Sequence, residues 1–185
     1  LKIDVSYAKG NTKNVISTSG GSPSFAMFGG TDRIGAYQSI GFGQTSDAVF
    51  LPGFLTGGAT GDIKLTEAWG VRGAFNHNWD PFWSTSFWGS YAGVRYNGDA
   101  FDILSAKGQF CASFNFGKTR SADYSCNPDF NIAQVGMVTR WTPVKNLTFS
   151  GEVQWVHLDQ KMSGSSRFTA TAPKPTALYE FKDQD

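Results

Sequence analysis

The residue types that perform most enzyme chemistry are few in this chain and lie far apart. Its two histidines, His77 and His157, have no cysteine, carboxylate pair or second histidine at a spacing that suits a metal ion. Asp123 and Asp129 lack the Asp-x-Asp-x-Asp spacing of a calcium loop. No nucleophile, base and orienting residue converge in the sequence. We therefore expect no catalytic residue, no metal site and no cofactor.

The two cysteines, Cys111 and Cys126, lie in a polar stretch without a Cys-x-x-Cys pair or a neighbouring histidine. A zinc site is disfavoured because it needs four ligands at short spacings. The favoured interpretation is a disulfide that closes the intervening loop. Such a bond would place the loop in an oxidising compartment, such as the periplasm or the cell surface. Two free thiols are the alternative.

The sequence also predicts long strands, whose polar faces would carry the remaining polar residues. The clearest of these patterns is a hairpin over residues 64–97. Apolar residues alternate with small or polar ones in its first limb, as in a strand of period two. Asp80-Pro81 predicts the reversal, because proline fixes φ and donates no ladder hydrogen bond. The apolar set of the first limb is Leu65, Trp69, Val71, Phe75 and Trp79, and that expected for the second is Trp88, Ala92, Val94 and Tyr96.

A four-residue connection in this hairpin would pair Phe75 with Trp88. It would also bring Arg72 and Tyr91 together on the opposite face. Residues 132–159 repeat the alternation around a turn at 142–146. The apolar residues of this second hairpin include Val135, Met137, Trp141, Phe149 and Trp155, and the polar ones include Gln134, Arg140, Glu152 and Gln154.

The remaining chain predicts shorter strands separated by long loops. We expect strands at 1–9, 34–44 and 176–181, and brief ones at 25–29 and 110–116. Long irregular connections at 50–62, 98–129 and 161–175 alternate with tight turns at 80–83 and 143–146. This asymmetry is typical of outer-membrane barrels, which have long external loops and short periplasmic turns.

Composition narrows the class of protein further. Aromatic residues make up 15% of the 185 residues and charged residues only 17%, a profile that suits many strands and open loops. Apolar runs stay well below the roughly 18 residues of a transmembrane helix, so a membrane protein of this sequence would be a barrel. A formal net charge of +1 without basic clusters gives no argument for nucleic acid.

Aromatic residues near the strand ends favour a membrane strand over a soluble sandwich, because such rings prefer the membrane interfaces. Trp79 and Trp83 bracket the first turn, and Tyr96 closes the far end of the hairpin. The expected lipid-facing and girdle residues are Trp69, Phe75, Trp79, Trp83, Trp88, Tyr96, Trp141 and Trp155. The expected pore-lining residues are Arg72, Arg95, Arg140, Glu152, Gln134, Gln154 and Tyr91.

Three blocks resemble the carboxy-terminal part of the alphaproteobacterial porin family. They are LTEAWGVRGAFNHNWDPFWSTSFWGSYAGVRYN, IAQVGMVTRWTPVKNLTFSGEVQW and ALYEFKDQD, with a two-cysteine loop between the first and second. The similarity covers residues 34–185. It implies an all-β fold, a transmembrane antiparallel β-barrel of 16 strands in the bacterial outer membrane. Its expected partners are outer-membrane lipid, lipopolysaccharide and two further copies in a homotrimer, and small hydrophilic solutes and ions would diffuse through its pore.

The resemblance also implies a role for the arginines. In such porins a row of basic side chains on the pore wall faces acidic residues of a constriction loop, and this role is assigned to Arg72 and, more weakly, to Arg95 and Arg140. The alternative is that these arginines simply lie on a solvated wall. No segment corresponds to that loop, and the chain stops without a final aromatic strand. Residues 1–185 are thus expected to be a single barrel domain, the carboxy-terminal half of a longer chain lacking its last strand. A complete small barrel is the alternative.

Two other functions compete with a general diffusion porin. One is a surface adhesin or carbohydrate-binding β-sandwich, which predicts that the faces of Trp69, Trp88 and Trp155 are buried against one another. The other is an outer-membrane enzyme, which the scattered chemistry disfavours. Ion selectivity and the identity of the solute do not follow from the sequence.

Overall fold

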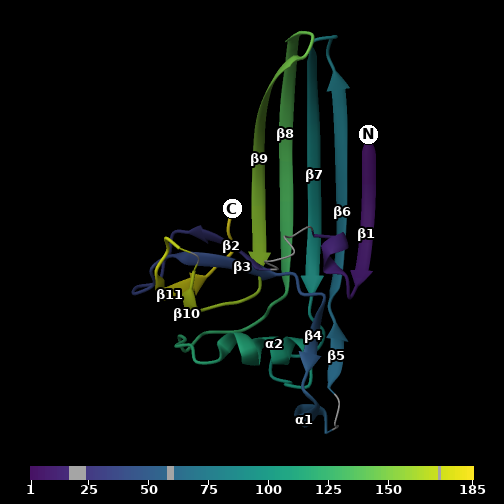
Figure 1. Ribbon diagram of the computed structural model, residues 1–185. Helices are drawn as coiled ribbons and strands as arrows, with labels where there is room; N and C mark the ends of the chain where they lie inside the picture. Colours follow the sequence, from purple (N-terminus) through teal and green to yellow (C-terminus); the bar gives the residue numbers. More distant parts are fainter. Residues whose placement is uncertain (17–23, 58–60, 171) are drawn as a thin grey trace.

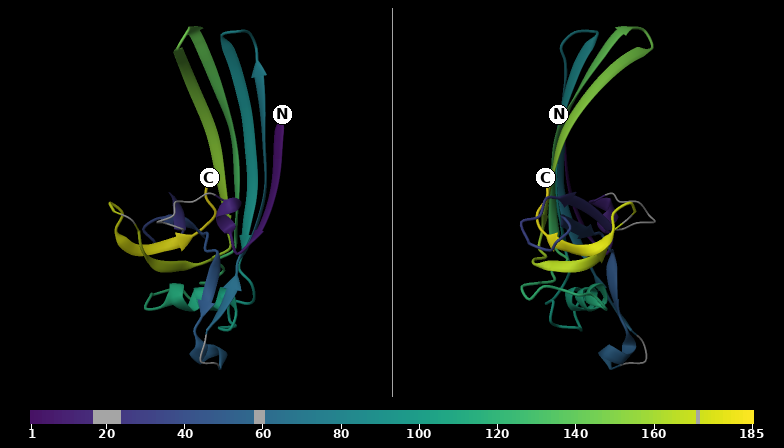
Figure 2. Two further views of the ribbon diagram at one scale, coloured as in Figure 1. Left: turned by 45° about the vertical axis from the view of Figure 1, so that its right-hand side comes forward. Right: turned by 90° about the vertical axis from the view of Figure 1, so that its left-hand side faces the viewer.

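The computed structural model describes residues 1–16, 24–57, 61–170 and 172–185. Its largest feature is a five-stranded antiparallel sheet in the order β1-β6-β7-β8-β9 (Figure 1). Its strands are β1 (Lys2–Lys9), β6 (Glu67–Asn78), β7 (Trp83–Arg95), β8 (Phe130–Val144) and β9 (Leu147–Gln160). The long strands curve together in one direction (Figure 2). Within the described residues the sheet does not close into a barrel, and β1 and β9 form its edges.

The remaining elements gather at the end of the sheet opposite its tight turns, and we call them the loop assembly (Figure 1). A four-stranded sheet has the order β10-β11-β3-β2, and a second, two-stranded sheet pairs β4 with β5. The strands are β2 (Ser24–Gly29), β3 (Ser39–Gln44), β4 (Ala48–Leu51), β5 (Asp62–Leu65), β10 (Ser165–Thr169) and β11 (Thr176–Phe181). The helices are η1 (Thr12–Asn14), α1 (Gly53–Thr56) and α2 (Ala106–Asn115).

The hydrophobic core lies where the loop assembly meets the ends of the long strands. Its fully buried members include Ile40, Val94, Phe130, Leu158 and Tyr179. The core therefore joins the two parts of the molecule, while most of the long sheet stays exposed. In the described ranges no helix has the length and apolarity needed to cross a membrane.

Both long hairpins and the strands predicted at 1–9 and 176–181 are present, whereas the strand predicted at 110–116 is wrong. That segment belongs to helix α2, which begins after Ser105, whose hydroxyl accepts a hydrogen bond from the Gly108 amide at 3.0 Å. Ala106, Phe110 and Phe114 recur at helical spacing and turn toward the core. The loop predicted at 161–175 contains β10, and the strand predicted at 34–44 is confined to β3.

The pairing predicted inside the first hairpin is also wrong. Phe75 faces Phe87 instead of Trp88. The Asp80 carboxylate accepts hydrogen bonds from the amides of Phe82 and Trp83 at 2.7 and 2.8 Å, which tightens the turn by one residue. Because side chains alternate with period two, a one-residue slip moves every side chain of β7 to the other face.

The corrected register gives the five strands two faces of opposite chemistry. Large apolar side chains share one side, which we call the apolar face, and small or polar side chains share the other, the polar face. The apolar face carries Ile3, Val5, Tyr7, Trp69, Val71, Phe75, Phe87, Tyr91, Val135, Met137, Trp141, Phe149, Val153 and Trp155, all exposed. The polar face carries Lys2, Asp4, Ser6, Arg72, Asn76, Ser86, Trp88, Ser90, Gln134, Val138, Arg140, Ser150, Glu152 and Gln154.

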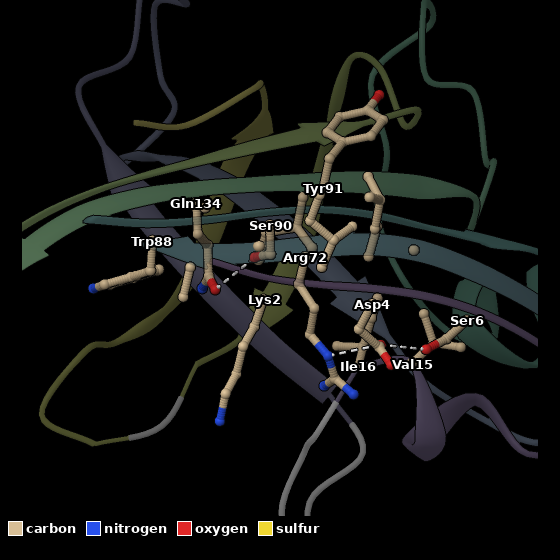
Figure 3. A pocket seen from close by; sticks show the side chains of 18 of the residues that line it. Lys2, Asp4, Ser6, Val15, Ile16, Arg72, Trp88, Ser90, Tyr91 and Gln134 are labelled. Carbon is tan, nitrogen blue, oxygen red and sulfur yellow. Dashed lines mark hydrogen bonds and ion pairs between the residues drawn. The ribbon is translucent and has the colours of Figure 1, made fainter. Parts of the chain in front are cut away.

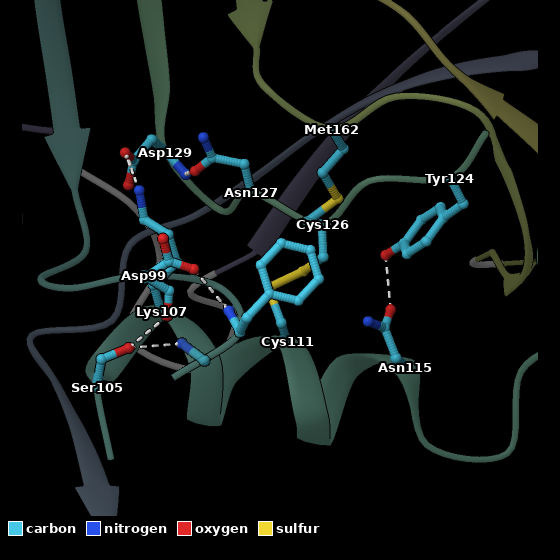
Figure 4. The surroundings of a disulfide bond; sticks show 12 residues. Asp99, Ser105, Lys107, Cys111, Asn115, Tyr124, Cys126, Asn127, Asp129 and Met162 are labelled. Atoms are coloured by element: carbon cyan, nitrogen blue, oxygen red, sulfur yellow. Dashed lines mark hydrogen bonds and ion pairs between the residues drawn. A yellow bond between two sulfur atoms is a disulfide. The ribbon is translucent and has the colours of Figure 1, made fainter. Parts of the chain in front are cut away.

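The predicted disulfide between Cys111 and Cys126 is present and ties α2 to the segment before β8 (Figure 4). The same helix is held by Lys107, whose ammonium lies 2.7 Å from the Asp129 carboxylate. The two links hold α2 at the end of the long sheet where β7 ends and β8 begins. The loop that contains the cysteines is therefore ordered around a helix.

Candidate functional site

The middle of the polar face carries a row of polar side chains that runs across four strands. Asp4, Arg72, Ser90 and Gln134 stand opposite one another in neighbouring strands. The Arg72 guanidinium donates to the Asp4 carboxylate at 2.9 Å, and the Ser90 hydroxyl donates to the Gln134 amide oxygen at 3.4 Å (Figure 3). Both members of the ion pair are more than half exposed, so the pair keeps its contact with water.

This row borders an open cavity of about 1270 Å³. Its other side is formed by Val15, Ile16 and Phe25, which belong to the segment between β1 and β6. The absence of a side chain at Gly70 allows this approach, because a Cβ there would come within 3.0 Å of Val15. A piece of the loop assembly thus lies over the polar face and narrows the space in front of it.

The apolar face carries one group of stacked aromatic rings near each end of the strands. Near the tight turns, Trp83 stacks on Trp141 with ring centroids 5.6 Å apart, and Trp141 stacks on Phe149 at 5.7 Å. Nearer the loop assembly, Trp69 lies 5.4 Å from Tyr91. Strand β7 rises about 27 Å from Trp83 to Tyr91 at about 3.4 Å per residue. Tilted as in barrels, this spacing is comparable to an apolar band of about 25 Å between two aromatic girdles.

From the row of Trp69 onward, the same side of the sheet carries polar and charged side chains. Glu67 pairs with Lys9 at 3.0 Å. Arg95 donates to the Asn131 side chain at 2.5 Å, and Asn131 donates to Asp159 at 2.8 Å. These polar and charged side chains mark the end of the apolar band on the side of the loop assembly.

The structure places five of the predicted pore-lining residues on the polar face: Arg72, Gln134, Arg140, Glu152 and Gln154. Tyr91 and Arg95 were expected to share the face of Arg72, and that placement is wrong. The Tyr91 ring packs against Trp69 and points away from the cavity (Figure 3). Arg95 is bonded to the carbonyls of Val94 and Phe130 at the end of its strand. Both errors come from the one-residue slip in β7.

Six of the predicted lipid-facing residues lie on the apolar side or at its turn, with exposed side chains: Trp69, Phe75, Trp79, Trp83, Trp141 and Trp155. Trp88 is on the polar face, contrary to expectation. Tyr96 is buried in the core beyond β7, where its ring lies 5.3 Å from Phe110 and its hydroxyl donates to the Gln44 carbonyl. Burial raises the pKa of Tyr96 to about 12.

Some residues of the site were not predicted from the sequence. Phe87 was missed because of the register error, and Asp4 was not connected with Arg72. The alternation in residues 1–9 predicted that Asp4 belongs to a strand, but it did not indicate which strand would be its neighbour. In the described ranges no group of three or more histidine, cysteine or carboxylate side chains could hold a metal ion.

A sheet with an apolar exposed face and a polar, hollowed opposite face has the arrangement of a membrane-channel wall. The family comparison agrees with this class. The family model described as the porin subfamily matches residues 3–185, and the chain belongs to this porin family. The protein is thus a membrane-channel protein of the porin type. No curated protein and no solved structure matches the chain.

Proposed function

We propose that the protein is a general diffusion porin of the bacterial outer membrane, which passes small hydrophilic solutes and ions without an enzymatic step. The observation that carries this proposal is the two-faced sheet. Its apolar face has the composition and height that suit lipid, and its polar face borders the 1270 Å³ cavity. Selectivity would then come from the width of the pore and the charge of its wall.

In this proposal the five strands are a section of a closed wall of 16 strands. Their length supports it, because a membrane strand needs about 9–11 residues and β6 to β9 have 12 to 15. The antiparallel bridge between Leu158 and Gln184 supports further pairing along the free edge of β9. The same proposal includes assembly as a homotrimer. It also includes contact between lipopolysaccharide and the charged side chains near the loop assembly.

The carbohydrate-binding sandwich is less well supported. It requires the aromatic face to be buried against a second layer, yet Trp69 and Trp155 are 38% and 47% exposed. Trp88, the third tryptophan of that hypothesis, lies on the opposite side of the sheet from them. The exposed aromatic face instead fits lipid.

A planar lipid bilayer tests the proposal directly. Protein purified in detergent from outer membranes is added to one side of the bilayer, and the current is recorded in potassium chloride. We expect stepwise increases in conductance that grow in proportion to the salt concentration, in groups of three for a trimer. A protein that stays soluble without detergent and gives no steps would overturn the proposal.

A further inference from the structure

Trp88 is the exception to the chemistry of its face. The other five tryptophans are exposed and lie on the apolar face or at its turn, whereas Trp88 is half-buried, projects from the polar face and lines the cavity. Its indole lies along the sheet (Figure 3). A Cβ on Gly136, its cross-strand neighbour, would come within 2.4 Å of the ring, so one side of the indole covers this glycine. The other side of the ring faces the cavity.

The neighbours of Trp88 in its own row are small. Ala74 stands opposite it on β6 and Gly136 on β8. Because these two neighbours have little or no side chain, neither stands above the indole, and a flat ligand can approach the ring past them. Gln154 ends this row on β9 with an amide, and Lys2 ends it on β1 with an ammonium group.

The rows on each side of the indole provide neutral hydrogen-bonding groups. Ser90 and Gln134 lie on one side, and Asn76 and Ser86, joined by a 2.7 Å hydrogen bond, lie on the other. The Gln134 amide nitrogen has no hydrogen-bond partner in the described part of the chain, so it is available as a donor. The charges around this site are mixed in sign: Lys2 ends the row of Trp88 on β1, Glu152 ends the row of Ser86 on β9, and Arg72 and Asp4 pair with each other. The Arg140 guanidinium also donates to the Ser86 hydroxyl at 3.1 Å.

A half-exposed aromatic surface bordered by amide and hydroxyl groups matches a ligand with one apolar face and hydroxyls at its rim. A pyranose ring has this chemistry, since its C–H groups can lie on the ring and its hydroxyls can bond to amides and hydroxyls. We infer that Trp88, with Gln134 and Gln154, forms a weak binding site for a neutral saccharide on the pore wall. This inference rests on the proposed porin function. Binding has to be weak, because a solute that crosses a pore must also leave its sites.

The competing interpretation is that Trp88 only covers Gly136, because an aromatic ring over a cross-strand glycine stabilises a sheet. The two interpretations differ in their effect on sugar binding. The test uses the intact protein in a planar bilayer and titrates maltotriose on both sides, with polyethylene glycol of similar size as the control for simple obstruction. We expect maltotriose to reduce and interrupt the current more than the polymer does.

Trp88→Ala should weaken the effect of maltotriose about tenfold, while Trp88→Phe should keep most of it. Trp155→Ala, on the apolar face, is the matched control and should leave the sugar effect unchanged. If Trp88→Ala forms no channels, Gln134→Leu decides, since it keeps the indole and should weaken the sugar effect severalfold. Channels that respond equally to both probes, or variants that keep the wild-type sugar effect, would overturn the site. Absence of channels in the wild type would instead overturn the porin function.

Discussion

The ammonium of Lys107 lies 2.7 Å from the carboxylate of Asp129, and the two side chains are only 15% and 13% exposed. The other oxygen of Asp129 accepts a hydrogen bond from the Tyr96 amide. Asp129 thus joins the end of β7 and the start of β8 to helix α2. The loop assembly is held to the long sheet by this link and by the disulfide.

Replacing Lys107 with methionine should lower the free energy of unfolding by about 2–3 kcal/mol. The substitution leaves the Asp129 charge without its partner in a site that is largely shielded from water. Lys161→Met is the control, because its pair with Asp159 is more exposed and should contribute less than about 1 kcal/mol. Urea unfolding in detergent measures both values, and equal losses in the two variants would contradict this account.

Removing the disulfide should also loosen the loop assembly. Cys111 and Cys126 are separated by 15 positions, and closing a loop of this length contributes about 3 kcal/mol in the chain-entropy model. The double variant Cys111→Ser/Cys126→Ser should be cleaved by protease between α2 and β8 faster than the oxidised protein. The long strands should resist the protease in both. Equal cleavage rates would show that the other contacts of α2 are sufficient.

We expect the protein to lose stability at alkaline pH because Tyr96 is buried. Its folded pKa, about 12, exceeds its ordinary value of 10.0 because burial disfavours the phenolate. Its contribution is therefore complete below pH 10 and is lost as the pH rises through 12, by at most about 2–3 kcal/mol. The free energy of unfolding should fall less steeply over this range in Tyr96→Phe than in the wild type. Identical slopes would refute the assignment.

The apolar face should reject charge. Phe75→Arg places a guanidinium among exposed apolar side chains, at a cost of about 2–4 kcal/mol near the middle of a bilayer. Asn76→Arg, one position further along β6 on the polar face, is the matched control and should insert normally. The yield of folded protein in lipid vesicles measures the difference. Normal insertion of Phe75→Arg would mean that this face does not meet lipid.

The long hairpins could be predicted from the sequence because their residues alternate over many positions. What the alternation did not provide was the register. The carboxylate of Asp80 bonds to two amides beyond Pro81 and shortens the turn, and this local contact decides which face Trp88 and Tyr91 occupy. Proline indicated the reversal but not its length.

The loop assembly was harder to predict because tertiary contacts decide its structure. Residues 110–116 are apolar in a short run, which suits a strand or a helix equally well. The disulfide and the Lys107 pair hold this segment as a helix against the core. Tyr96 resembled a girdle residue in the sequence, yet the chain around it folds over and buries it.

In a porin wall the two faces of one strand meet different surroundings, water on one side and lipid on the other, and adjacent residues of β8 test this most directly. The native cysteines form a disulfide, so single cysteines can be introduced at Gln134 on the polar face and Val135 on the apolar face. A charged, membrane-impermeant methanethiosulfonate is then added while the channel current is recorded in a bilayer. We expect a rapid change in current for Gln134→Cys and none for Val135→Cys. Modification of Val135→Cys with Gln134→Cys unaffected would contradict the assignment of the two faces.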